Sequence, residues 1–581
     1  MRGLTSIWIS EARKDLTPEH ASLRSSHKLK SPCNAISCTQ GHWFLYRPLN
    51  NSGMGNALLK DTSLLKTKNH YPDSTLNDSM HPHMTKNPAA SLSITQGLKL
   101  TWIASAFYLK LGLISMLSLG GLCAKEAPNF ILVLTDDQGW TSLSAAMDLR
   151  RPNSKSDYHK TPNMDALLER GMRFSNGYAA APVCSPTRYS IQFGKSPARL
   201  NYTRVLGRNG ADHNQVGIPQ VLKAADPDYL CAHLGKWHIS ADPERYGYDV
   251  HDGKTTNREG GFTMKDNDRE WGGYAEDDPK RVFSLTNRAI DFMQKSLKEE
   301  RPFFIQISHY AVHSNLVYNE EAFDEVGNWP DGKVHQNRAY AAMVHNLDQS
   351  IGLLLEAYDA MDLAENTYLI FTSDNGGMPT LPIQLNKGKP YPAGLNSPLL
   401  RGKWDLTEGG IRVPFAVMGP GVEAGSQSNE PVISYDLLPT LADIAGATDA
   451  LPDELDGRSI HPVLKNPDTK IQRPPEGLVF HFPHYNVVGL NEPHSAIRIG
   501  DYKLLKFTSS KRELLFNVAD DPSESEDLYD ANIALAGKLN AELESYLDAV
   551  GAEKPEDSNS WKDWNGRSGA TKTLFLSRYP K

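Results

Sequence analysis

The sequence predicts an α/β fold: a large mixed, mostly parallel sheet covered by helices on both faces, and a smaller C-terminal α+β subdomain with an antiparallel sheet plus a helix. Three observations support this prediction. Strand-like apolar runs alternate with helical patterns over about 300 residues, as in parallel sheets. Two of the runs end in polar turns rich in Asp and Asn. Near the C-terminus, several short strand patterns precede one helical pattern.

The strands of the main domain are predicted from short runs of apolar and β-branched residues. These runs lie at residues 130–135, 229–234, 303–307, 367–372 and 413–418. The first run leads into Asp136-Asp137-Gln138-Gly139, and the fourth leads into Ser373-Asp374-Asn375-Gly376. Parallel sheets bind ligands beyond the carboxyl ends of their strands, so we expect both turns on the same side of the sheet.

The helices of the main domain are predicted at residues 162–170, 189–193, 282–298, 340–355 and 436–445. The first has Thr161 as its expected N-cap and Pro162 at its first position, and Gly171 is expected to end it. Gly194 and Gly446 are expected to end two others. The fourth shows apolar residues at steps of three and four, the clearest amphipathic pattern in the chain.

The C-terminal subdomain is predicted to follow a linker rich in Pro and charge at residues 466–476. Its short antiparallel strands are expected at 478–482, 495–499, 502–507 and 513–517, and its helix at 533–547. The predicted domains are therefore 125–465 and 466–550, with a loosely attached tail at 551–581. Residues 242–280 lack periodicity and are rich in Gly, Asp and Asn, so we expect surface loops that shape a pocket.

The N-terminal region differs from the rest of the chain. Residues 1–109 are polar and without sustained periodicity, which predicts disorder or a gene-model extension ahead of an internal start such as Met84. Residues 110–124 have a charge, an apolar core and small residues, which is typical of a signal peptide cleaved near Ala124. We therefore expect a secreted or periplasmic protein. The alternative, a lipoprotein acylated at Cys123, is weaker because Leu122 stands where a small residue is expected.

Composition restricts the possible partners. The chain has 581 residues, 39% of them hydrophobic and 22% charged, with a net charge of −8, which describes an ordinary globular protein. No basic stripe favours nucleic acid as a partner, and no interior apolar run is long enough for stable membrane insertion. Cleavage near Ala124 would leave only Cys184 and Cys231 of the five cysteines, and we expect these two not to be bridged.

Cys184 stands in the segment Pro-Val-Cys-Ser-Pro-Thr-Arg, residues 182–188. The prolines stiffen the backbone, and Arg188 places a permanent cation four residues after the cysteine. The pattern therefore suggests a reactive group held beside a cation. By itself it also fits a small buried cysteine that enters a helix.

The two acidic turns indicate a metal site. Asp136, Asp137, Asp374 and Asn375 would repel one another at a single point unless a cation joined them. Carboxylate and amide oxygens without histidine or thiolate suit Ca²⁺, and less well Mg²⁺, in preference to Zn²⁺. Either motif alone also fits a turn after a strand. Both together, at the ends of two buried strands, favour the metal.

Together with Gly235-Lys236-Trp237-His238, His313 and the segment 403–410, Lys-Trp-Asp-Leu-Thr-Glu-Gly-Gly, these motifs resemble the formylglycine-dependent sulfatases. These are the type I (arylsulfatase-like) family of the alkaline phosphatase superfamily. The resemblance runs from about Asn129 to Leu528, with the motifs in family order. One departure is Gln192-Phe193, where the family usually has Leu-Thr, although the Cys-x-Pro-Ser/Thr-Arg core is intact.

The resemblance implies a set of site residues. The implied calcium ligands are Asp136, Asp137, Asp374 and Asn375, and the implied catalytic residues are Cys184, Arg188, Lys236, His238, His313 and Lys403. A formylglycine-generating enzyme or an anaerobic maturase would oxidise Cys184 to formylglycine before folding. The hydrated aldehyde offers two hydroxyls, one to attack sulfur and release the alcohol, the other to expel sulfate.

The resemblance also assigns roles within this set. Lys236 and Lys403 hold the sulfate, and Arg188 holds the hydroxyl and the carboxylates on the metal side. His238 takes a proton from the second hydroxyl, while His313 protonates the departing oxygen with help from Lys403. Asp374 is a further proton acceptor. His309 is an alternative to His313, but the number of residues between Pro302 and the histidine favours His313.

Two other functions stay open at this point. A phosphatase or phosphonate hydrolase of the superfamily would commonly use zinc and place a histidine where Asn375 stands, and a non-catalytic binding protein would keep only the fold. A sulfated glycan is favoured as substrate over a simple aryl sulfate, because Trp271 and Trp329 could pack on sugar rings. Asp436, Arg458 and Arg498 are expected to stabilise the fold.

Overall fold

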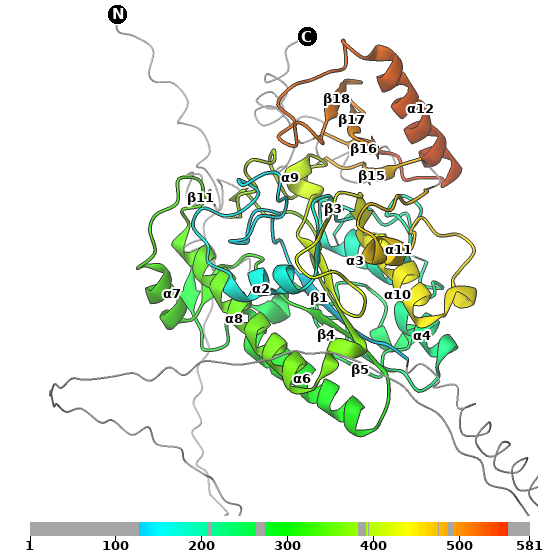
Figure 1. Ribbon diagram of the computed structural model, residues 1–581. Coiled ribbons are helices and arrows are strands. Elements are labelled where there is room, and N and C mark those ends of the chain that lie inside the picture. Colours follow the sequence, from blue (N-terminus) through cyan, green and yellow to red (C-terminus); the bar gives the residue numbers. More distant parts are fainter. Residues whose placement is uncertain are drawn as a thin grey trace, which may run out of the picture. The chain divides into compact units, whose positions relative to one another are not determined.

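The computed structural model describes residues 127–205, 212–262, 273–381, 391–392, 394–473, 476–485 and 492–555 (Figure 1). All of these belong to one compact unit. The predicted N-terminal extension and signal peptide, with Met84, Cys123 and Ala124, lie outside the described residues, as do Trp271 and residues 556–581 of the tail. Among the described helices, none combines the length and the apolar composition needed to cross a membrane.

The main sheet has eight strands in the order β13-β2-β12-β9-β1-β7-β4-β5. Their bounds are β1 Asn129–Thr135, β2 Met172–Phe174, β4 Leu230–Gly235, β5 Val250–His251, β7 Phe303–Ser308, β9 Thr367–Ser373, β12 Phe415–Met418 and β13 Gln427–Ser428. The five strands from β9 to β5 are mutually parallel, whereas β12 pairs antiparallel with both β9 and β2. The predicted mixed, mostly parallel sheet is therefore confirmed.

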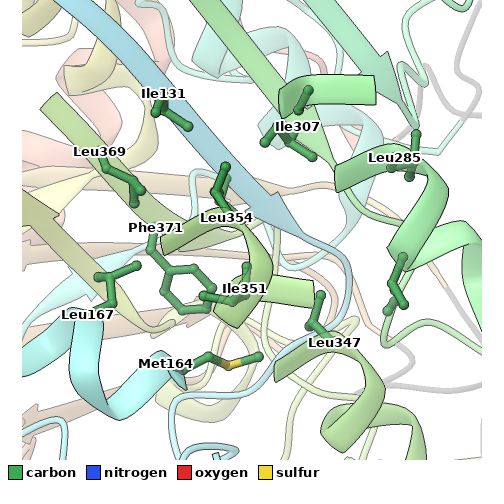
Figure 2. Close-up of a cluster of buried hydrophobic side chains, with 14 of the residues drawn as sticks. Ile131, Met164, Leu167, Leu285, Ile307, Leu347, Ile351, Leu354, Leu369 and Phe371 are labelled. Atoms are coloured by element: carbon green, nitrogen blue, oxygen red, sulfur yellow. The ribbon is translucent and has the colours of Figure 1, made fainter. Parts of the chain in front are cut away.

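Helices cover both faces of this sheet. One face carries α2 Pro162–Arg170, α6 Val282–Lys298 and α8 Arg338–Ala360, and the other carries α3 Cys184–Phe193, α4 Ile218–Ala225, α10 Leu437–Ala445 and α11 His461–Lys465. Side chains of a strand alternate between faces, so Ile131 and Val133 join the first layer while Leu132 and Leu134 join the second. Figure 2 shows the first layer, where α8 packs against β1 and β9.

Several shorter elements complete the main domain. They are β3 Gly177–Tyr178 paired with β14 Val432–Ile433, β6 Tyr274–Ala275 paired with β8 Val317–Tyr318, β10 Thr380–Leu381 paired with β11 Tyr391–Pro392, and the helices α7 Glu320–Val326 and α9 Glu408–Ile411. The expected loops at 242–280 contain only short elements among their described residues. One of these, β5, extends the main sheet.

Helix α2 differs from the prediction at its N-terminus. Thr161 does not cap it: its hydroxyl donates instead to Asp165 Oδ1, at 2.9 Å. The cap comes from α8, because Asp348 Oδ1 accepts from the backbone N–H groups of Asn163 (3.1 Å) and Met164 (2.8 Å). Helix α2 is therefore tied to α8 through its first turn.

Two helices begin elsewhere than predicted. Helix α3 was expected at 189–193 but begins at Cys184, and it ends at Gly194 in the left-handed region (φ 64°), as expected. Helix α10 was expected from Asp436, but that residue closes the preceding 3₁₀ turn, Ser434–Asp436, and α10 begins at Leu437. The earlier start of α3 places Cys184 in its first turn.

The C-terminal subdomain is an antiparallel sheet with one helix, as predicted. Its strands are β15 Leu478–Phe482, β16 His494–Ile499, β17 Tyr502–Phe507 and β18 Glu513–Asn517, in sequence order, and α12 Ile533–Ala549 packs on one face (Figure 1). The other face packs on the main domain around Tyr178 and Leu406. We expected loose attachment after Gly551, but Glu553 is buried and accepts from the Thr203 hydroxyl at 2.7 Å.

Candidate active site

The predicted metal ligands lie together because their two strands are neighbours. Strands β1 and β9 pair in parallel with Thr135 opposite Ser373, so Asp136-Asp137 and Asp374-Asn375 leave the sheet side by side. The Asp137 N–H donates to Asp374 Oδ1 at 3.2 Å, and Asn375 Nδ2 donates to Asp137 Oδ1 at 2.7 Å. All four residues are buried. Asp137 has φ 59°, a strained conformation for a residue with a side chain.

Two buried oxygens at these strand ends have no hydrogen-bond partner among the described residues: Asp136 Oδ1 and Asn375 Oδ1. A buried polar atom without a partner is costly, which points to a ligand that the protein side chains do not supply. Both atoms are hard oxygen donors, and Asp137 adds a carboxylate beside them. The residues present therefore fit a hard cation such as Ca²⁺.

Of the three carboxylates, Asp374 makes the closest contacts with Arg188. Its Oδ2 lies 2.8 Å from Arg188 Nε and 2.7 Å from Arg188 Nη2. Burial and the neighbouring Asp136 nevertheless raise the pKa of Asp374. Arg188 Nη1 also donates to the carbonyl of Lys236. The guanidinium thus links α3, the end of β9 and the segment after β4.

Both predicted lysines pair with the strand-end carboxylates. Lys236, directly after β4, lies 2.5 Å from Asp136 Oδ2. Lys403 lies 2.6 Å from Asp137 Oδ1 and 2.7 Å from Oδ2. Burial opposes the charge of Lys403, but the Asp137 carboxylate dominates and raises the pKa of Lys403. Two lysine side chains thus contact the carboxylates of the predicted metal site.

Cys184 lies buried at the start of α3, within this group. Its Sγ and single ligand atoms of Asp136, Asp137 and His313 all lie within 4.8 Å of one another. Burial raises the pKa of the Cys184 thiol, although Lys236 and Lys403 act against this. An unmodified thiol here stays protonated at neutral pH and is a poor nucleophile. Cys184 and Cys231 are both free, so the predicted absence of a bridge between them is confirmed.

His313 reaches the site through the turn after β7. The Asp136 N–H donates to the Ala311 carbonyl at 2.9 Å, and the Val312 N–H donates to the Asp136 carbonyl at 2.6 Å, which fixes this turn against β1. His313 Nε2 then lies 3.7 Å from Asp137 Oδ2 and 3.2 Å from Asn257 Nδ2. His309, the alternative, has both ring nitrogens buried without a partner among the described residues, and burial lowers its pKa to about 4.

Both site histidines are neutral in this environment. Burial, followed by the charges of nearby lysines, holds the pKa values of His238 and His313 well below the ordinary value. His313 Nδ1 lies 2.5 Å from the Ser314 carbonyl, so this nitrogen carries the proton and Nε2 accepts. His238 Nδ1 has no partner among the described residues. An acid role for His313 therefore requires that the anionic substrate first raise its pKa.

The turn after β9 holds both Lys403 and α9 through close backbone contacts. The Lys403 N–H donates to the Gly377 carbonyl at 3.0 Å, and the Gly376 N–H donates to the Gly410 carbonyl at 2.9 Å. A Cβ atom on Gly376 would lie 1.9 Å from the Gly409 carbonyl oxygen, so only glycine fits there. The Gly-Gly pair of the 403–410 motif and the Gly of Asp-Asn-Gly therefore have a steric purpose.

A buried ionic cluster then joins α9 to the C-terminal subdomain. Lys503 Nζ lies 3.0 Å from Glu408 Oε1 and 2.9 Å from Glu524 Oε1, and all three side chains are fully buried. Tyr178 donates to Glu408 Oε2 at 2.7 Å. Because Lys403 and Glu408 lie in the same short segment, this buried cluster also holds the segment that carries the site lysine.

The residues expected to stabilise the fold lie in other networks. Asp436 accepts from the backbone N–H groups of Ile433 and Arg458, and Arg498 donates to Asn176 Oδ1 at 3.0 Å. The unusual Gln192 is also satisfied, because it donates to Gln306 Oε1 at 2.7 Å and accepts from the Tyr248 hydroxyl at 3.0 Å.

The expected sugar-stacking role of Trp329 is not supported by its surroundings. Trp329 is only 8% exposed, packs edge-on against Tyr158 and His345, and has Lys160 Nζ 5.0 Å from its ring centroid. Its indole is therefore part of a small core and does not present a free face. The pattern of interspersed Trp did not reveal this burial.

Two polar residues near His313 were not predicted from the sequence. Asn257 contacts its Nε2, as described above, and has a buried Oδ1 without a partner among the described residues. Lys280 is 2% exposed, and its charge acts on His313 and on Asp136. Each lies in a short 3₁₀ turn, Asn257–Gly260 or Pro279–Arg281, where neither spacing nor periodicity marks a residue.

The comparisons with known proteins agree with this geometry. The chain matches the Sulfatase family over residues 128–447 and the N-sulphoglucosamine sulphohydrolase C-terminal family over residues 402–552. It is 30% identical over 378 residues to N-acetylgalactosamine-6-sulfatase from Homo sapiens, covering 60% of this chain and 67% of that protein. It is 26% identical over 477 residues to ulvan-active sulfatase from Formosa agariphila, covering 77% and 86%. The solved structure of Ps i-CgsB in complex with k-i-k-neocarrahexaose superimposes with a TM-score of 0.58 at 25% identity, covering 78% of this chain and 100% of that chain.

Proposed function

Because the chain belongs to the sulfatase family, as a type I sulfatase of the alkaline phosphatase superfamily and thus a sulfuric ester hydrolase, we propose that it removes sulfate from a sulfated carbohydrate. The proposed site has Cys184 as formylglycine and Ca²⁺ held by Asp136, Asp137, Asp374 and Asn375. The observation that carries it is the position of Cys184, buried within 4.8 Å of ligand atoms of Asp136, Asp137 and His313.

Charge complementarity supports sulfate as the group bound. A sulfate monoester carries negative charge on its outer oxygens, and three cationic side chains contact the strand-end carboxylates: Lys236 after β4, Lys403 ahead of α9, and Arg188 in α3. We assign Lys236 and Lys403 to the sulfate oxygens and Arg188 to orienting residue 184 and Asp374. Fixed cations in a buried site stabilise developing negative charge without reorganisation.

The modified cysteine would supply, as its hydrate, two hydroxyls on one carbon. Burial raises the pKa of the plain thiol, so an unmodified Cys184 would be a poor nucleophile, which supports the modification. We assign the proton acceptor to His238, because burial holds its pKa low and its Nδ1 has no partner among the described residues. Once the anionic substrate has raised its pKa, His313 would take up a proton at Nε2 and donate it to the departing alcohol oxygen, with Lys403 assisting.

The substrate class rests on the nature of the relatives. The name of N-acetylgalactosamine-6-sulfatase and the neocarrahexaose complex of Ps i-CgsB both refer to sugars. We therefore favour a sulfated glycan over an aryl sulfate. A formylglycine-generating or anaerobic maturase is the proposed partner during biosynthesis, and the signal-like segment 110–124 supports secretion or a periplasmic location.

Activity assays on purified protein, produced with a maturase, test this proposal. We expect hydrolysis of 4-nitrophenyl sulfate to exceed that of 4-nitrophenyl phosphate, and a screen of sulfated mono- and disaccharides to identify a better substrate. Chelation should abolish turnover, and Ca²⁺ should restore it better than Zn²⁺. A preference for the phosphate ester, or zinc in the site, would instead favour the phosphatase alternative.

Mass spectrometry of the peptide that contains residue 184 tests the modification separately. We expect the aldehyde or its hydrate in active protein. Active protein that carries only the unmodified thiol would refute formylglycine.

A further inference from the structure

Ser185 links the segment of Cys184 to the segment of His238. It follows Cys184 in the first turn of α3 and is fully buried. Its hydroxyl donates to the backbone carbonyl of His238 at 2.6 Å. The residue next to the proposed nucleophile therefore contacts the backbone of the proposed proton acceptor.

This contact is one of three between α3 and the segment after β4. Arg188 Nη1 donates to the carbonyl of Lys236, and the Tyr189 hydroxyl accepts from the N–H of Ser240 at 3.0 Å. Arg188 and Tyr189 follow Ser185 by three and four residues, so the three side chains share one face of the helix. Their partners are alternate residues of the segment, and Ser185 contacts the middle one. The helix that begins at the proposed nucleophile thus holds the backbone of this segment at three points.

The backbone of His238 needs such support. His238 has φ 57°, in the left-handed region, which is strained for a residue with a side chain. Its carbonyl accepts from Ser185, and its N–H donates to the carbonyl of Thr255 at 2.9 Å. The Thr255 hydroxyl also accepts from the Trp237 N–H at 2.9 Å. Ser185 and Thr255 therefore hold His238 at its two backbone polar groups.

The hydroxyl of Ser185 does not stabilise its own helix. Buried serines within helices commonly donate to a carbonyl of the preceding turn, as Ser296 in α6 and Ser350 in α8 do. Ser185 donates instead to a different segment of the chain. Its hydrogen bond therefore fixes the position of the His238 segment relative to α3.

We propose that Ser185 is a positioning residue that sets the place of the His238 imidazole relative to residue 184. The inference rests on the proposed sulfatase function and deepens it, because it assigns Ser185 to the second half of the reaction. In that half, the alcohol has already left, and His238 accepts the proton of the free hydroxyl on residue 184. The electron pair of that O–H bond forms the aldehyde C=O bond, while the C–O bond to sulfate breaks and its electron pair leaves with the sulfate.

Amide hydrogen exchange tests the contact without turnover. The full chain is produced without a maturase, so that Cys184 is unmodified. In Ser185→Ala, the peptide that covers residues 236–240 should exchange about fivefold faster than in the parent, because one buried hydrogen bond is lost. Ser185→Thr keeps the hydroxyl and should stay within about twofold of the parent. Exchange in Ser185→Ala that equals the exchange in the parent would overturn the proposal.

Ser190→Ala is the matched control. Ser190 is a fully buried serine in the same helix, and its Oγ has no partner among the residues that the structure describes. The variant therefore removes a hydroxyl from α3 without removing a contact to the His238 segment. We expect the peptide exchange and the activity of Ser190→Ala to stay within about twofold of the parent.

Kinetics on protein produced with a maturase test the step. The modified fraction at residue 184 is measured by mass spectrometry in each variant, so that rates are compared per modified site. In Ser185→Ala, kcat for 4-nitrophenyl sulfate should fall by about tenfold or more because His238 is displaced. The first release of 4-nitrophenol does not use His238, so kcat/KM should stay within about threefold, and a burst should precede the slow phase.

Two kinetic results would contradict this role. An unchanged kcat would show that the placement of His238 does not depend on Ser185. A loss of kcat/KM as large as the loss of kcat, without a burst, would place the effect on the attack at sulfur. If the parent hydrolyses no sulfate ester at all, the proposed function fails, while hydrogen exchange still decides whether Ser185 holds the His238 segment.

Discussion

At the scale of single residues, charge compensation organises the site. Three buried carboxylates would repel one another, and each is held by a specific cation: Lys236 on Asp136, Lys403 on Asp137, and Arg188 on Asp374. Two oxygens of the site, Asp136 Oδ1 and Asn375 Oδ1, have no partner in the described part of the chain, and a hard cation fits there.

Arg188→Lys tests the need for a guanidinium at this position. Two guanidinium nitrogens lie 2.7–2.8 Å from Asp374 Oδ2 while a third donates to the Lys236 carbonyl, and a lysine ammonium cannot reproduce this fork. We expect kcat/KM for 4-nitrophenyl sulfate to fall by about tenfold to a hundredfold. The control is Arg199→Lys, which alters a similar Arg–Asp456 pair outside the site. A similar loss of activity in both variants would contradict a specific role.

At the scale of elements, the site depends on how strand ends and helix starts meet. Strands β1 and β9 bring their turns together by parallel pairing, α3 begins at Cys184, and α9 approaches β9 where Gly376, Gly409 and Gly410 lack side chains. These contacts join segments that are far apart in the sequence.

Gly376→Ala tests the approach of α9 to β9. The new Cβ would lie 1.9 Å from the Gly409 carbonyl oxygen, a clash with backbone that no side-chain rotation relieves. We expect a loss of about 1–3 kcal/mol in the free energy of unfolding, together with lower activity as Lys403 shifts. The control, Gly537→Ala in α12, meets nothing within 4 Å and should stabilise by up to about 1 kcal/mol. If Gly376→Ala has the same free energy of unfolding as the parent, the backbone at Gly376 and Gly409 can move apart and the close approach is not required.

Asp348 makes the joint between α2 and α8 sensitive to pH. Burial raises the pKa of this carboxyl to about 7, against a value near 4 in the unfolded chain. The folded protein then binds more protons than the unfolded chain between about pH 4 and pH 7, so this residue's contribution to stability declines as pH rises through that window and is flat above it. Asp348→Asn removes the titration.

Urea unfolding at pH 5 and pH 8 measures this effect. From pH 5 to pH 8, we expect the free energy of unfolding of the parent to fall by about 2–3 kcal/mol more than that of Asp348→Asn. Equal losses in the two proteins would show that Asp348 titrates normally in the fold.

The elements were predictable to the extent that their signals are local. Helix α6 and the four strands of the C-terminal subdomain follow from apolar patterns and have the expected bounds within a residue. The cap on α2 was missed because Asp348 lies far along the chain from the turn that it caps. In the site, the meeting of Asp136-Asp137 with Asp374-Asn375 could be inferred from the two motifs, whereas nothing in the sequence around Lys280 and Asn257 indicates which residues lie near them.

At the scale of the whole molecule, a buried ionic cluster links the C-terminal subdomain to the segment that carries Lys403. Lys503 on β17 pairs with Glu408, at the start of α9, and with Glu524 in its own subdomain. Because Lys403 precedes α9 by a few residues, the docking of the subdomain also orders the segment that carries this lysine. The two parts are therefore expected to unfold together.

Lys503→Met tests this coupling. The change leaves two carboxylates buried without their shared cation, which should cost about 3–5 kcal/mol in the free energy of unfolding and lower activity as well. Lys506→Met is the control on the same strand: its partners, Glu513 and Glu544, are partly exposed, so we expect a loss below about 1 kcal/mol. If the Tm of Lys503→Met is no lower than that of Lys506→Met, the buried cluster does not hold the subdomain to the main domain.

The most direct test of the whole account is the sulfatase activity of Cys184→Ala beside that of the parent and of Cys231→Ala. If residue 184 supplies the nucleophile, kcat/KM for 4-nitrophenyl sulfate should fall by about a thousandfold or more in Cys184→Ala, whereas Cys231→Ala should retain activity. Hydrolysis by Cys184→Ala at the rate of the parent would show that the reaction takes place without this side chain, and the proposed site would be wrong.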